Sequence, residues 1–429
     1  MENYLFEKMP VPKAYMKLAL PVVLSMIVSL VYNMVDTYFI ALTGVQELVA
    51  GVSLVAPMFT LMISRLLGEK KDNEAKKTCA FCIWVSLVFG LCISAILLLF
   101  RTQILGLLGV SKVTYEYANA YYTWIAIGAV SIIFSMVPSN ILRTEGLAVQ
   151  SMAGSIIGSI VNIIFDPIFI FGLNQGAAGA AMATVLGNII ADIYYVYAVI
   201  KKSKRLTCSP SHMKITGRRV KDILMIGIPA SITNIMQTFM MVMTNNFLLP
   251  YGTDKVAAMG IALKVNMITA LVLVGFAFGG QPLVGYNYGA KNEKRLKNIL
   301  KFAYLFEIGL GLLFTIIMCI FAPQIIKVFM DKPDIITNGA MMLRFQQMGM
   351  IFMSVTLIST CVCQAVGNAG GAFVLSISRQ GVIYVLALLI MSNVFGYTGV
   401  LVSQACSDVV TALIAVGIML RIMKKLIKN

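Results

Sequence analysis

Long apolar stretches recur along nearly the whole chain, and they limit the folds that it can adopt. An α-helix needs about 20 apolar residues to cross the hydrocarbon core of a bilayer. Only helices and closed barrels can cross it, because every backbone N–H and C=O must be paired within the protein. Barrel strands would be short and would alternate in polarity, whereas these stretches are long and rich in Leu, Ile, Ala, Gly and Met. We therefore predict twelve transmembrane helices, over approximately 18–42, 48–67, 76–100, 116–138, 148–172, 177–200, 223–249, 256–282, 300–322, 340–365, 370–395 and 398–420.

The overall composition excludes a water-soluble globular protein. Hydrophobic residues make up 59% of the 429 residues and charged residues only 12%. That leaves too little polar surface to cover a soluble domain. The sequence therefore predicts an all-α integral membrane protein.

The positions of the basic residues predict the orientation in the membrane. Short loops that carry Lys and Arg stay on the cytoplasmic side. If the N-terminus is cytoplasmic, 27 of the 34 Lys and Arg lie on that side, Arg379 among them. Six lie on the opposite side, and Lys264 falls inside a predicted span. We predict that both termini are cytoplasmic.

The formal net charge of +16 does not indicate nucleic-acid binding. The basic residues are spread over every inward loop and do not cluster with aromatic residues on one face. Anionic lipid headgroups are the expected partner of these loops. Nucleic acid is not an expected partner.

Cysteine and histidine usage argues against a metal or catalytic centre. The eight cysteines show no framework, and we interpret them as small apolar fillers. The single histidine, His212, lies in a basic loop. A centre built from several histidines is therefore impossible within this chain, which weakens most readings as a membrane enzyme.

An internal repeat divides the chain into two halves. Residues 18–40 and 226–248 share one layout, in which Pro21 matches Pro229. Since each half contains six predicted spans, both halves enter the membrane from the same side, as parallel repeats do. Two such lobes would leave a central cleft that suits alternating access. We predict an N-terminal lobe, a basic cytoplasmic linker and a C-terminal lobe, over 1–200, 201–222 and 223–429 respectively.

Two carboxylates lie within apolar stretches of the first half. Asp36 lies in the first stretch and Asp166 in the fifth, where Asn162 precedes Asp166 by four residues and shares its helix face. An intramembrane carboxylate is costly, so we expect these two to face each other, water or a cation. Their environment would allow a proton to bind and leave. Carboxylate and amide oxygens suit Na⁺ equally well.

Purely structural roles are the alternative for each of these residues. Asp166 precedes Pro167 and could satisfy backbone donors that an interrupted helix releases. Pro21 could be a tolerated kink, or a bend that moves Asp36. For the remaining charges in or near the predicted spans, snorkelling of the side chain to the membrane surface is the default expectation: Lys264, Glu307, Asp192 and Asp408.

A resemblance to a known family rests on four stretches that occur in order: KLALPVVLSMIVSLVYNMVDTYFIALTG, RLLGEKKDNEAKKT, ILRTEG and IVNIIFDPIFIFGLNQGAAGAAMATVLG. They resemble the multidrug and toxic compound extrusion (MATE) transporters, within the wider multidrug, oligosaccharidyl-lipid and polysaccharide exporter superfamily. The resemblance covers nearly the whole chain. It implies a V-shaped bundle of two six-helix lobes that exports organic, often cationic, compounds in exchange for Na⁺ or H⁺, without a cofactor.

The acidic pattern is similar to the branch named after the DNA-damage-inducible protein F. The cation site of that branch falls on Asp36, Asn162, Asp166 and Thr184 of this sequence. Tyr32 and Asn33 lie nearby, and we assign them, with Pro21, to the substrate cavity and its gating. The expected partners are small organic molecules and membrane lipids, and the expected state is a monomer in the cytoplasmic (inner) membrane of a prokaryote.

Other function classes remain open. A flippase for lipid-linked oligosaccharides, from the same superfamily, would need basic residues in the cleft, and Lys264 is the only one clearly inside a predicted span. A membrane-embedded enzyme or a receptor would need a catalytic cluster or a signalling domain. Neither is visible in the sequence, so we predict a transporter and not an enzyme.

The repeat fails in the second predicted span. From Gly260 to Gly289 the second half uses 29 steps, whereas from Gly51 to Gly68 the first half uses only 17. The deficit of 12 residues corresponds to about 18 Å of helix. Either the missing piece is a loop or the second helix is shortened, and we favour a shortened helix that still spans the membrane.

A shortened second helix would leave the first lobe thinner and leakier on its cytoplasmic side. Insertion of a 12-residue apolar segment after Ile63, copied from 268–279, is then expected to raise thermal stability or efflux. Melting temperature and transport rate are the two readouts. If neither changes, the gap is harmless and the hypothesis is wrong.

Overall fold

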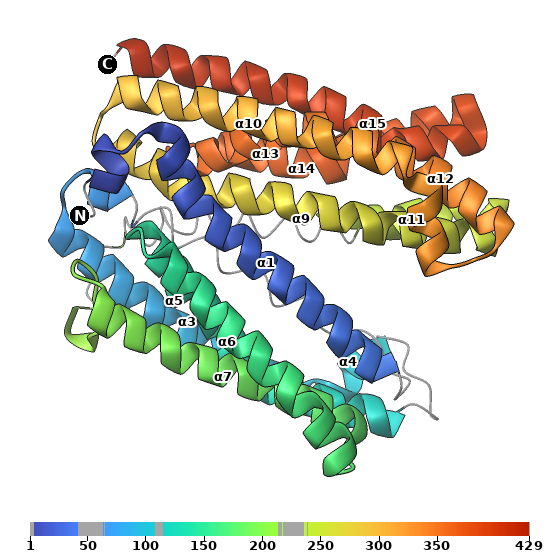
Figure 1. Cartoon of the computed structure of the whole chain (residues 1–429), viewed down its shortest axis with the longest axis horizontal. Helices are drawn as coiled ribbons and strands as arrows, with labels where there is room; N and C mark the ends of the chain where they lie inside the picture. The colour runs from blue at the N-terminus through green and yellow to red at the C-terminus, as the bar shows by residue number, and fades with distance from the viewer. Residues whose placement is uncertain are drawn as a thin grey trace. The chain divides into compact units, whose positions relative to one another are not determined.

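The computed structural model describes residues 4–41, 63, 65–107, 115–212, 217, 236–237 and 239–428. These residues form helices, and there is no β-strand among them (Figure 1). The chain divides into two compact units. Unit 1 consists of Met1–Leu5 and Leu20–Ile223, and unit 2 of Phe6–Ala19 and Leu224–Asn429. These units are defined by packing, and they group the start of the first helix with the second half of the chain. The lobe boundaries predicted from the sequence stay a prediction.

Unit 1 is built around one group of long helices. The described elements are the later part of α1 (Val11–Ala41), α3 (Asp72–Leu99), α4 (Arg101–Leu107), α5 (Tyr115–Thr144), α6 (Ala148–Pro167), the π-helix η2 (Ile168–Gly172), α7 (Gly176–Lys202) and the 3₁₀ turn η3 (Pro210–His212). Helix α7 packs along both α5 and α6, and α3 packs on α5 (Figure 1).

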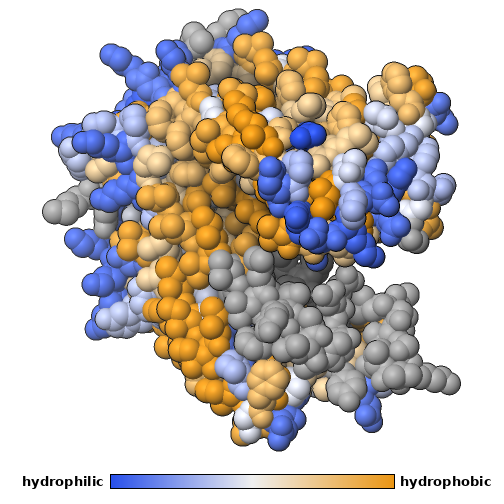
Figure 2. Space-filling model, turned by 45° about the vertical axis from the view of Figure 1, so that its right-hand side comes forward, coloured by the Kyte–Doolittle hydropathy of each residue, from blue (hydrophilic) through white to orange (hydrophobic). Residues whose placement is uncertain are grey.

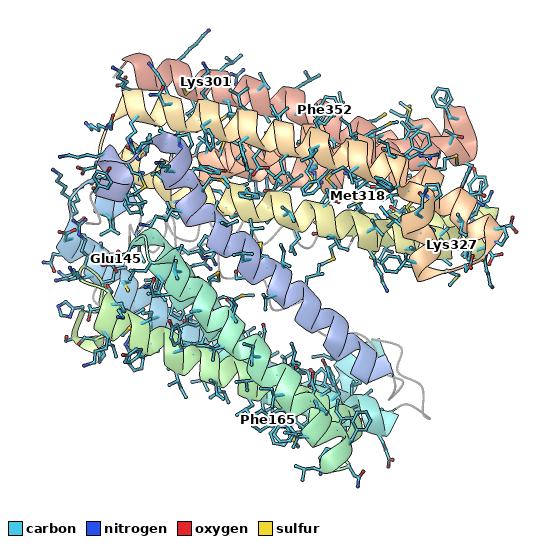
Figure 3. The ribbon with its side chains drawn as sticks, viewed as in Figure 1. Glu145, Phe165, Lys301, Met318, Lys327 and Phe352 are labelled. Atoms are coloured by element: carbon cyan, nitrogen blue, oxygen red, sulfur yellow. The ribbon has the colours of Figure 1, made fainter. Side chains whose placement is uncertain are left out.

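A buried glutamate joins the end of α5 to the segment that follows α7. Glu145 is 3% exposed, and its Oε1 accepts the backbone N–H groups of Lys204 and Arg205, each at 2.9 Å. Figure 3 labels this side chain. Trp84 on α3 donates its ring N–H to the carbonyl of Cys208, at 3.0 Å. The segment after α7 is thus held against unit 1 by hydrogen bonds from two helices.

Unit 2 contains the remaining helices. They are α9 (Thr253–Gly289), α10 (Glu293–Ile320), α11 (Ala322–Phe329), α12 (Pro333–Met348), α13 (Met350–Ala365), α14 (Ala369–Ile377), the π-helix η5 (Ser378–Val382) and α15 (Ile383–Lys428), with the 3₁₀ turn η4 (Leu249–Tyr251) before α9. The π-helix η1 (Tyr4–Lys8) begins in unit 1 and ends in unit 2. A buried cluster joins α9, α11, α12 and α15, with Met259, Ile326, Leu343 and Leu401 among its members.

The start of α1 is fixed to unit 2 by specific contacts. Tyr15 is buried, and its phenol donates to the carbonyl of Phe276 at 2.9 Å. Ala19 lies so close to α9 that a Cβ on Gly279 would come within 2.4 Å of the Ala19 Cα. Arg295 donates to the Phe6 carbonyl at 2.7 Å. Burial of Tyr15 and the glycine contact together anchor Phe6–Ala19 within unit 2.

One break in unit 2 corrects a predicted helix boundary, and a second break coincides with one. The predicted single span 340–365 is two helices, α12 and α13, which begin at Pro333 and bend by 40° between Met348 and Met350. Helix α15 would be about 70 Å long if straight, more than twice the hydrocarbon thickness. It is interrupted at Gly396, whose φ of +54° is one that residues other than glycine rarely adopt. The predicted spans 370–395 and 398–420 therefore meet at a glycine kink.

The described residues include eight helices that are long and apolar enough to cross a membrane, or nine if α12 and α13 count as one span. Large apolar side chains are exposed on them, for example Ile193 at 65% and Leu413 at 68%. Figure 2 shows hydrophobic residues over much of the visible surface. Such exposure would be a liability in water but suits contact with lipid. The predicted spans 48–67 and 223–249 lie mostly outside the described residues. The predicted shortening of the second helix therefore stays a prediction.

A charged turn follows residue 68 and precedes α3. Glu69 accepts hydrogen bonds from Arg65 at 3.1 Å and from Lys71 at 2.7 Å. Burial acts to raise the pKa of Glu69, but the hydrogen bonds from Lys71 and Arg65 outweigh it and hold that pKa below its usual value. A lowered pKa in the folded state means that the interaction stabilises the protein above the unfolded-state pKa and is lost as the pH falls through the folded-state pKa.

Glu69→Gln is therefore expected to lower the free energy of unfolding at neutral pH by less than about 1 kcal/mol, because solvent reaches all three side chains, with Arg65 40%, Lys71 53% and Glu69 23% exposed. The difference from the unchanged protein should disappear in acid. Thermal unfolding of the purified protein in detergent, followed as a function of pH, measures it. Glu116→Gln, at an exposed position on α5, serves as the control. A difference that persists in acid would contradict the assignment.

Candidate functional site

All of the residues predicted to bind the coupling cation fall in unit 1. Asp36 lies on α1, Asn162 and Asp166 on α6, and Thr184 on α7. The side chains of residues 31–40, including those of Tyr32, Asn33 and Asp36, lie outside the described residues. The predicted proximity of the Asp36 and Asp166 side chains therefore stays a prediction.

Asn162 and Thr184 meet between α6 and α7. The Asn162 Nδ2 donates to the Thr184 Oγ1 at 3.1 Å, and the two residues are 2% and 8% exposed. Asn188, one turn further along α7, donates to the Thr184 backbone carbonyl at 2.8 Å. Within the described residues, the Asn162 Oδ1 accepts no hydrogen bond. A buried amide oxygen without a donor is one that a bound cation can use.

Two glycines set the close approach of α6 and α7 at this point. A Cβ on Gly187 would lie 2.5 Å from the carbonyl oxygen of Gly158, and a Cβ on Gly158 would lie 2.9 Å from the carbonyl oxygen of Gly187. Small residues allow two membrane helices to pack with their backbones in contact. A Cβ on Gly187 would also lie 3.4 Å from the Asn162 Cβ. This backbone contact brings Asn162 within reach of Thr184.

Asp166 lies one turn beyond Asn162, on the same face of α6, and is fully buried. Helix α6 ends at the next residue, Pro167, and continues as the π-helix η2. Single turns of π-helix occur often at functional sites, because they redirect side chains within a helix. The start of α7 packs tightly against η2, since a Cβ on Gly179 would lie 2.6 Å from the Phe169 carbonyl carbon. The arrangement holds a buried carboxylate, an amide and a hydroxyl in one part of unit 1.

Pro21 is buried within α1, and the helix continues through it from Val11 to Ala41. Its proposed role in bending the helix that carries Asp36 stays a prediction.

Snorkelling is the wrong expectation for Asp408, which is buried. Arg379 lies in η5, and its Nε is 2.8 Å from the Asp408 Oδ1. The Asp408 side chain is 3% exposed, and Gln404 also donates to its Oδ1, at 3.2 Å. Each charge is buried because the other compensates it. The two residues are 29 positions apart, so the pairing has no local signal in the sequence.

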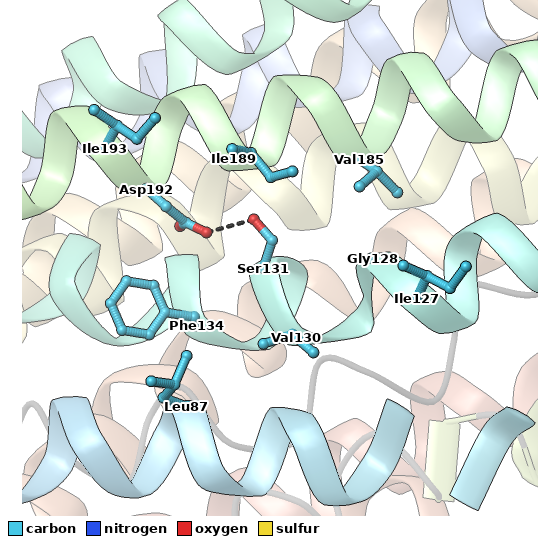
Figure 4. Close-up of a pocket in the computed structure, with 10 residues that line it drawn as sticks. All are labelled: Leu87, Ile127, Gly128, Val130, Ser131, Phe134, Val185, Ile189, Asp192 and Ile193. Carbon is cyan, nitrogen blue, oxygen red and sulfur yellow. Dashed lines mark hydrogen bonds between the residues drawn. The ribbon is translucent and has the colours of Figure 1, made fainter. Parts of the chain in front are cut away.

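Snorkelling is also wrong for Asp192 and Glu307. Ser131 on α5 donates to the Asp192 Oδ2, at the side of a cavity of about 380 Å³ in unit 1 (Figure 4). The other lining residues are mostly apolar, among them Leu87, Phe134 and Ile189. Glu307 on α10 is fully buried. Lys264 is exposed on α9, and snorkelling of its side chain stays a prediction.

The described side chains of the predicted site offer carboxylate, amide and hydroxyl groups. Within the described residues, no three His, Cys, Asp or Glu side chains come together as they would in a transition-metal centre. Carboxylate, amide and hydroxyl oxygens are the ligands of hard cations such as Na⁺, and a carboxylate alone can carry a proton. The prediction that these residues bind a small cation stays a prediction.

Comparison with known proteins fixes the family. The MatE family profile matches residues 21–168 and 229–390, which is well over half of the chain. The chain belongs to the MATE family. The resemblance seen in the sequence is thus confirmed, whereas assignment to one branch of the family stays a prediction. MATE proteins are transporters, so the family does not indicate an enzyme.

Relatives match over almost their whole length. The multidrug export protein MepA of Staphylococcus saprophyticus subsp. saprophyticus is 28% identical over 426 residues, which cover 96% of this chain and 94% of the relative. MepA of Staphylococcus aureus strain MSSA476 is 29% identical over 429 residues, with the same two coverages.

Solved MATE structures share the fold. A crystal structure of MATE in complex with MaL6 has a TM-score of 0.93 at 23% identity, covering 100% of this chain and 99% of that one. An outward-facing multidrug resistance MATE family transporter of the MOP superfamily has a TM-score of 0.92 at 23% identity, with coverages of 99% and 98%. The predicted all-α, multi-pass MATE fold is confirmed.

Proposed function

We propose that this MATE family protein is a secondary active multidrug efflux antiporter, which exchanges amphipathic, often cationic, organic compounds for Na⁺ or H⁺ by alternating access. The relatives named multidrug export protein support the substrate class. The observation that carries the coupling role is the buried Asn162–Thr184 contact one turn from the buried Asp166. Asp36, on the first helix, is assigned to the same site from the sequence.

The physical basis of coupling is the cost of a buried carboxylate. Without a cation, the charge of Asp166 is held in a low-dielectric interior, where it is costly. Binding of Na⁺ or of a proton cancels that charge, so occupancy of the site changes which conformation is stable. A drug that binds better in one conformation than in the other is then linked to the cation by their differential affinities.

The setting of this activity is the cytoplasmic membrane of a prokaryote. The distribution of basic residues supports cytoplasmic termini, and the exposed apolar side chains support direct contact with lipid. We assign the functional unit to a monomer, because each chain carries the complete set of proposed cation ligands.

Transport in proteoliposomes tests the proposal. A fluorescent lipophilic cation is supplied outside vesicles that contain the purified protein, and either a proton gradient or a sodium gradient is imposed. We expect the dye to move against its own gradient with one of the two ions, and the movement to stop when an ionophore dissipates that gradient. Vesicles without protein give the background. If neither gradient moves the dye while a fluorescent lipid-linked sugar crosses the bilayer, the protein is a flippase and the proposal is wrong.

A further inference from the structure

A carboxyl group lies at the centre of unit 2, away from either end of its helix. Glu307 is on α10 (Glu293–Ile320), between Lys301 and Met318, which Figure 3 labels. About 20 Å of helix separates it from each end of α10, and about 10 Å separates it from the start of the predicted span at residue 300. It is 0% exposed and lies on the buried face of α10 with Ala303 and Gly311.

This carboxyl group has no structural partner in the described part of the chain. Neither Oε1 nor Oε2 of Glu307 takes part in a hydrogen bond there, and no ion pair there includes it. Asp408, in the same unit, differs in that Arg379 compensates its charge. Burial of a polar group without a partner reduces stability, so a purely structural role does not explain Glu307.

The ionisable neighbours of Glu307 among the described residues are a tyrosine and a cysteine. Tyr15 of α1 and Cys361 of α13 are the ionisable groups that interact with it electrostatically, and both are neutral at physiological pH. The Tyr15 hydroxyl already donates a hydrogen bond to the Phe276 carbonyl. Among the described residues, the neighbouring helices α9, α11 and α12 contribute no charged group that interacts with Glu307. Among the described residues, a carboxylate at Glu307 would therefore have no opposite charge beside it.

Polar side chains continue from Glu307 toward the end of the unit where α9 and α10 join. Tyr304, one turn earlier on α10, hydrogen-bonds to Ser359 at 2.7 Å. Between α9 and α13, Gln281 donates to Gln364 at 2.9 Å. Hydroxyl and amide groups of this kind can pass a proton along with intervening water. Both pairs lie on the side of Glu307 that faces the predicted cytoplasmic end of the helices.

We propose that Glu307 is a second protonation site, in unit 2, which binds and releases one proton in each transport cycle. On loading, an O–H bond forms at the carboxylate with a proton from water. On release, that bond breaks and the proton returns to water along the Tyr304–Ser359 side. The coupling role of Glu307 rests on the proposed function. Proton binding by Glu307 does not, because it can be measured without transport.

Infrared spectroscopy of the purified protein in lipid bilayers tests proton binding directly. The band of the protonated carboxyl group is followed as the pH rises, for the unchanged protein, Glu307→Gln and the control Glu293→Gln on the exposed start of the same helix. We expect Glu307→Gln to lose a band that persists after the exposed carboxyl groups have ionised, and Glu293→Gln to keep that band. If the unchanged protein and Glu307→Gln give the same titration, Glu307 does not exchange a proton and the proposal is overturned.

Transport separates a coupling role from a packing role. Under an imposed proton gradient, Glu307→Gln is expected to reduce efflux by about 5–150-fold, the usual size of coupling between two sites. Glu307→Asp, which keeps the carboxyl group, should retain transport that depends on pH. Melting temperatures show whether both variants are folded. Efflux by folded Glu307→Gln at the unchanged rate would overturn the proposal. If the unchanged protein itself moves no drug, the proposed function fails, and the infrared titration still decides whether Glu307 binds a proton.

Discussion

Asp166→Asn is expected to abolish gradient-driven drug efflux, a loss of more than about a hundredfold, while the protein remains inserted in the membrane. Asparagine has nearly the shape of aspartate but cannot carry a proton or the charge that attracts Na⁺. Because Asp166 is fully buried one turn from Asn162, no solvent-exposed group can replace it. Drug uptake into proteoliposomes, at matched protein content, measures the loss.

The sequence predicts the same outcome for Asp36→Asn. A matched control is Asp72→Asn, which removes an exposed carboxylate at the start of α3. Thr184→Val, which keeps the shape and removes the hydroxyl that Asn162 contacts, is expected to weaken cation dependence without abolishing transport. Efflux by Asp166→Asn at the unchanged rate would remove Asp166 from the cation site.

Arg379→Met is expected to cause the largest loss of stability, about 3–5 kcal/mol, because it leaves the Asp408 charge buried without its cation. Removing both charges, as in Arg379→Met with Asp408→Leu, should restore most of that loss, since a buried ion pair stabilises little more than apolar residues of similar volume. Thermal unfolding in detergent measures both variants.

The exposed pair Lys327–Asp331 provides the control for this comparison. Its atoms are 3.9 Å apart and both side chains are more than 60% exposed, so Lys327→Met should change stability by less than about 1 kcal/mol. Equal effects of Arg379→Met and Lys327→Met would contradict the assignment of a buried pair.

The sequence was sufficient for the helical membrane fold but not for its internal breaks. Apolar length determines where a helix can cross a bilayer, and most predicted spans coincide with helices of the described residues. The bend at Gly349 was not predicted. A Cβ there would lie 2.4 Å from the Asp408 Oδ2, a contact between segments almost 60 residues apart. Such packing has no signature in local hydrophobicity.

The candidate site was predicted in part from the residues and in part from the family resemblance. The spacing of Asn162 and Asp166 was visible as one helix face, whereas Thr184 was unremarkable without the resemblance. Glu307 was misread because a sequence shows a charge in an apolar stretch but not whether a partner faces it. Burial and the lack of a partner among the described residues are properties of the packed helices.

Ion movement driven by drug, in proteoliposomes without any imposed ion gradient, tests the central claim most directly. An antiporter must run in reverse when only the drug gradient is present, since the coupling between two ligands is reciprocal. We predict that an outward drug gradient drives Na⁺ or H⁺ inward, that an inward gradient drives it outward, and that Asp166→Asn does neither. If the drug crosses the membrane through the protein and no ion moves in the opposite direction, the protein is not an antiporter and the account is wrong.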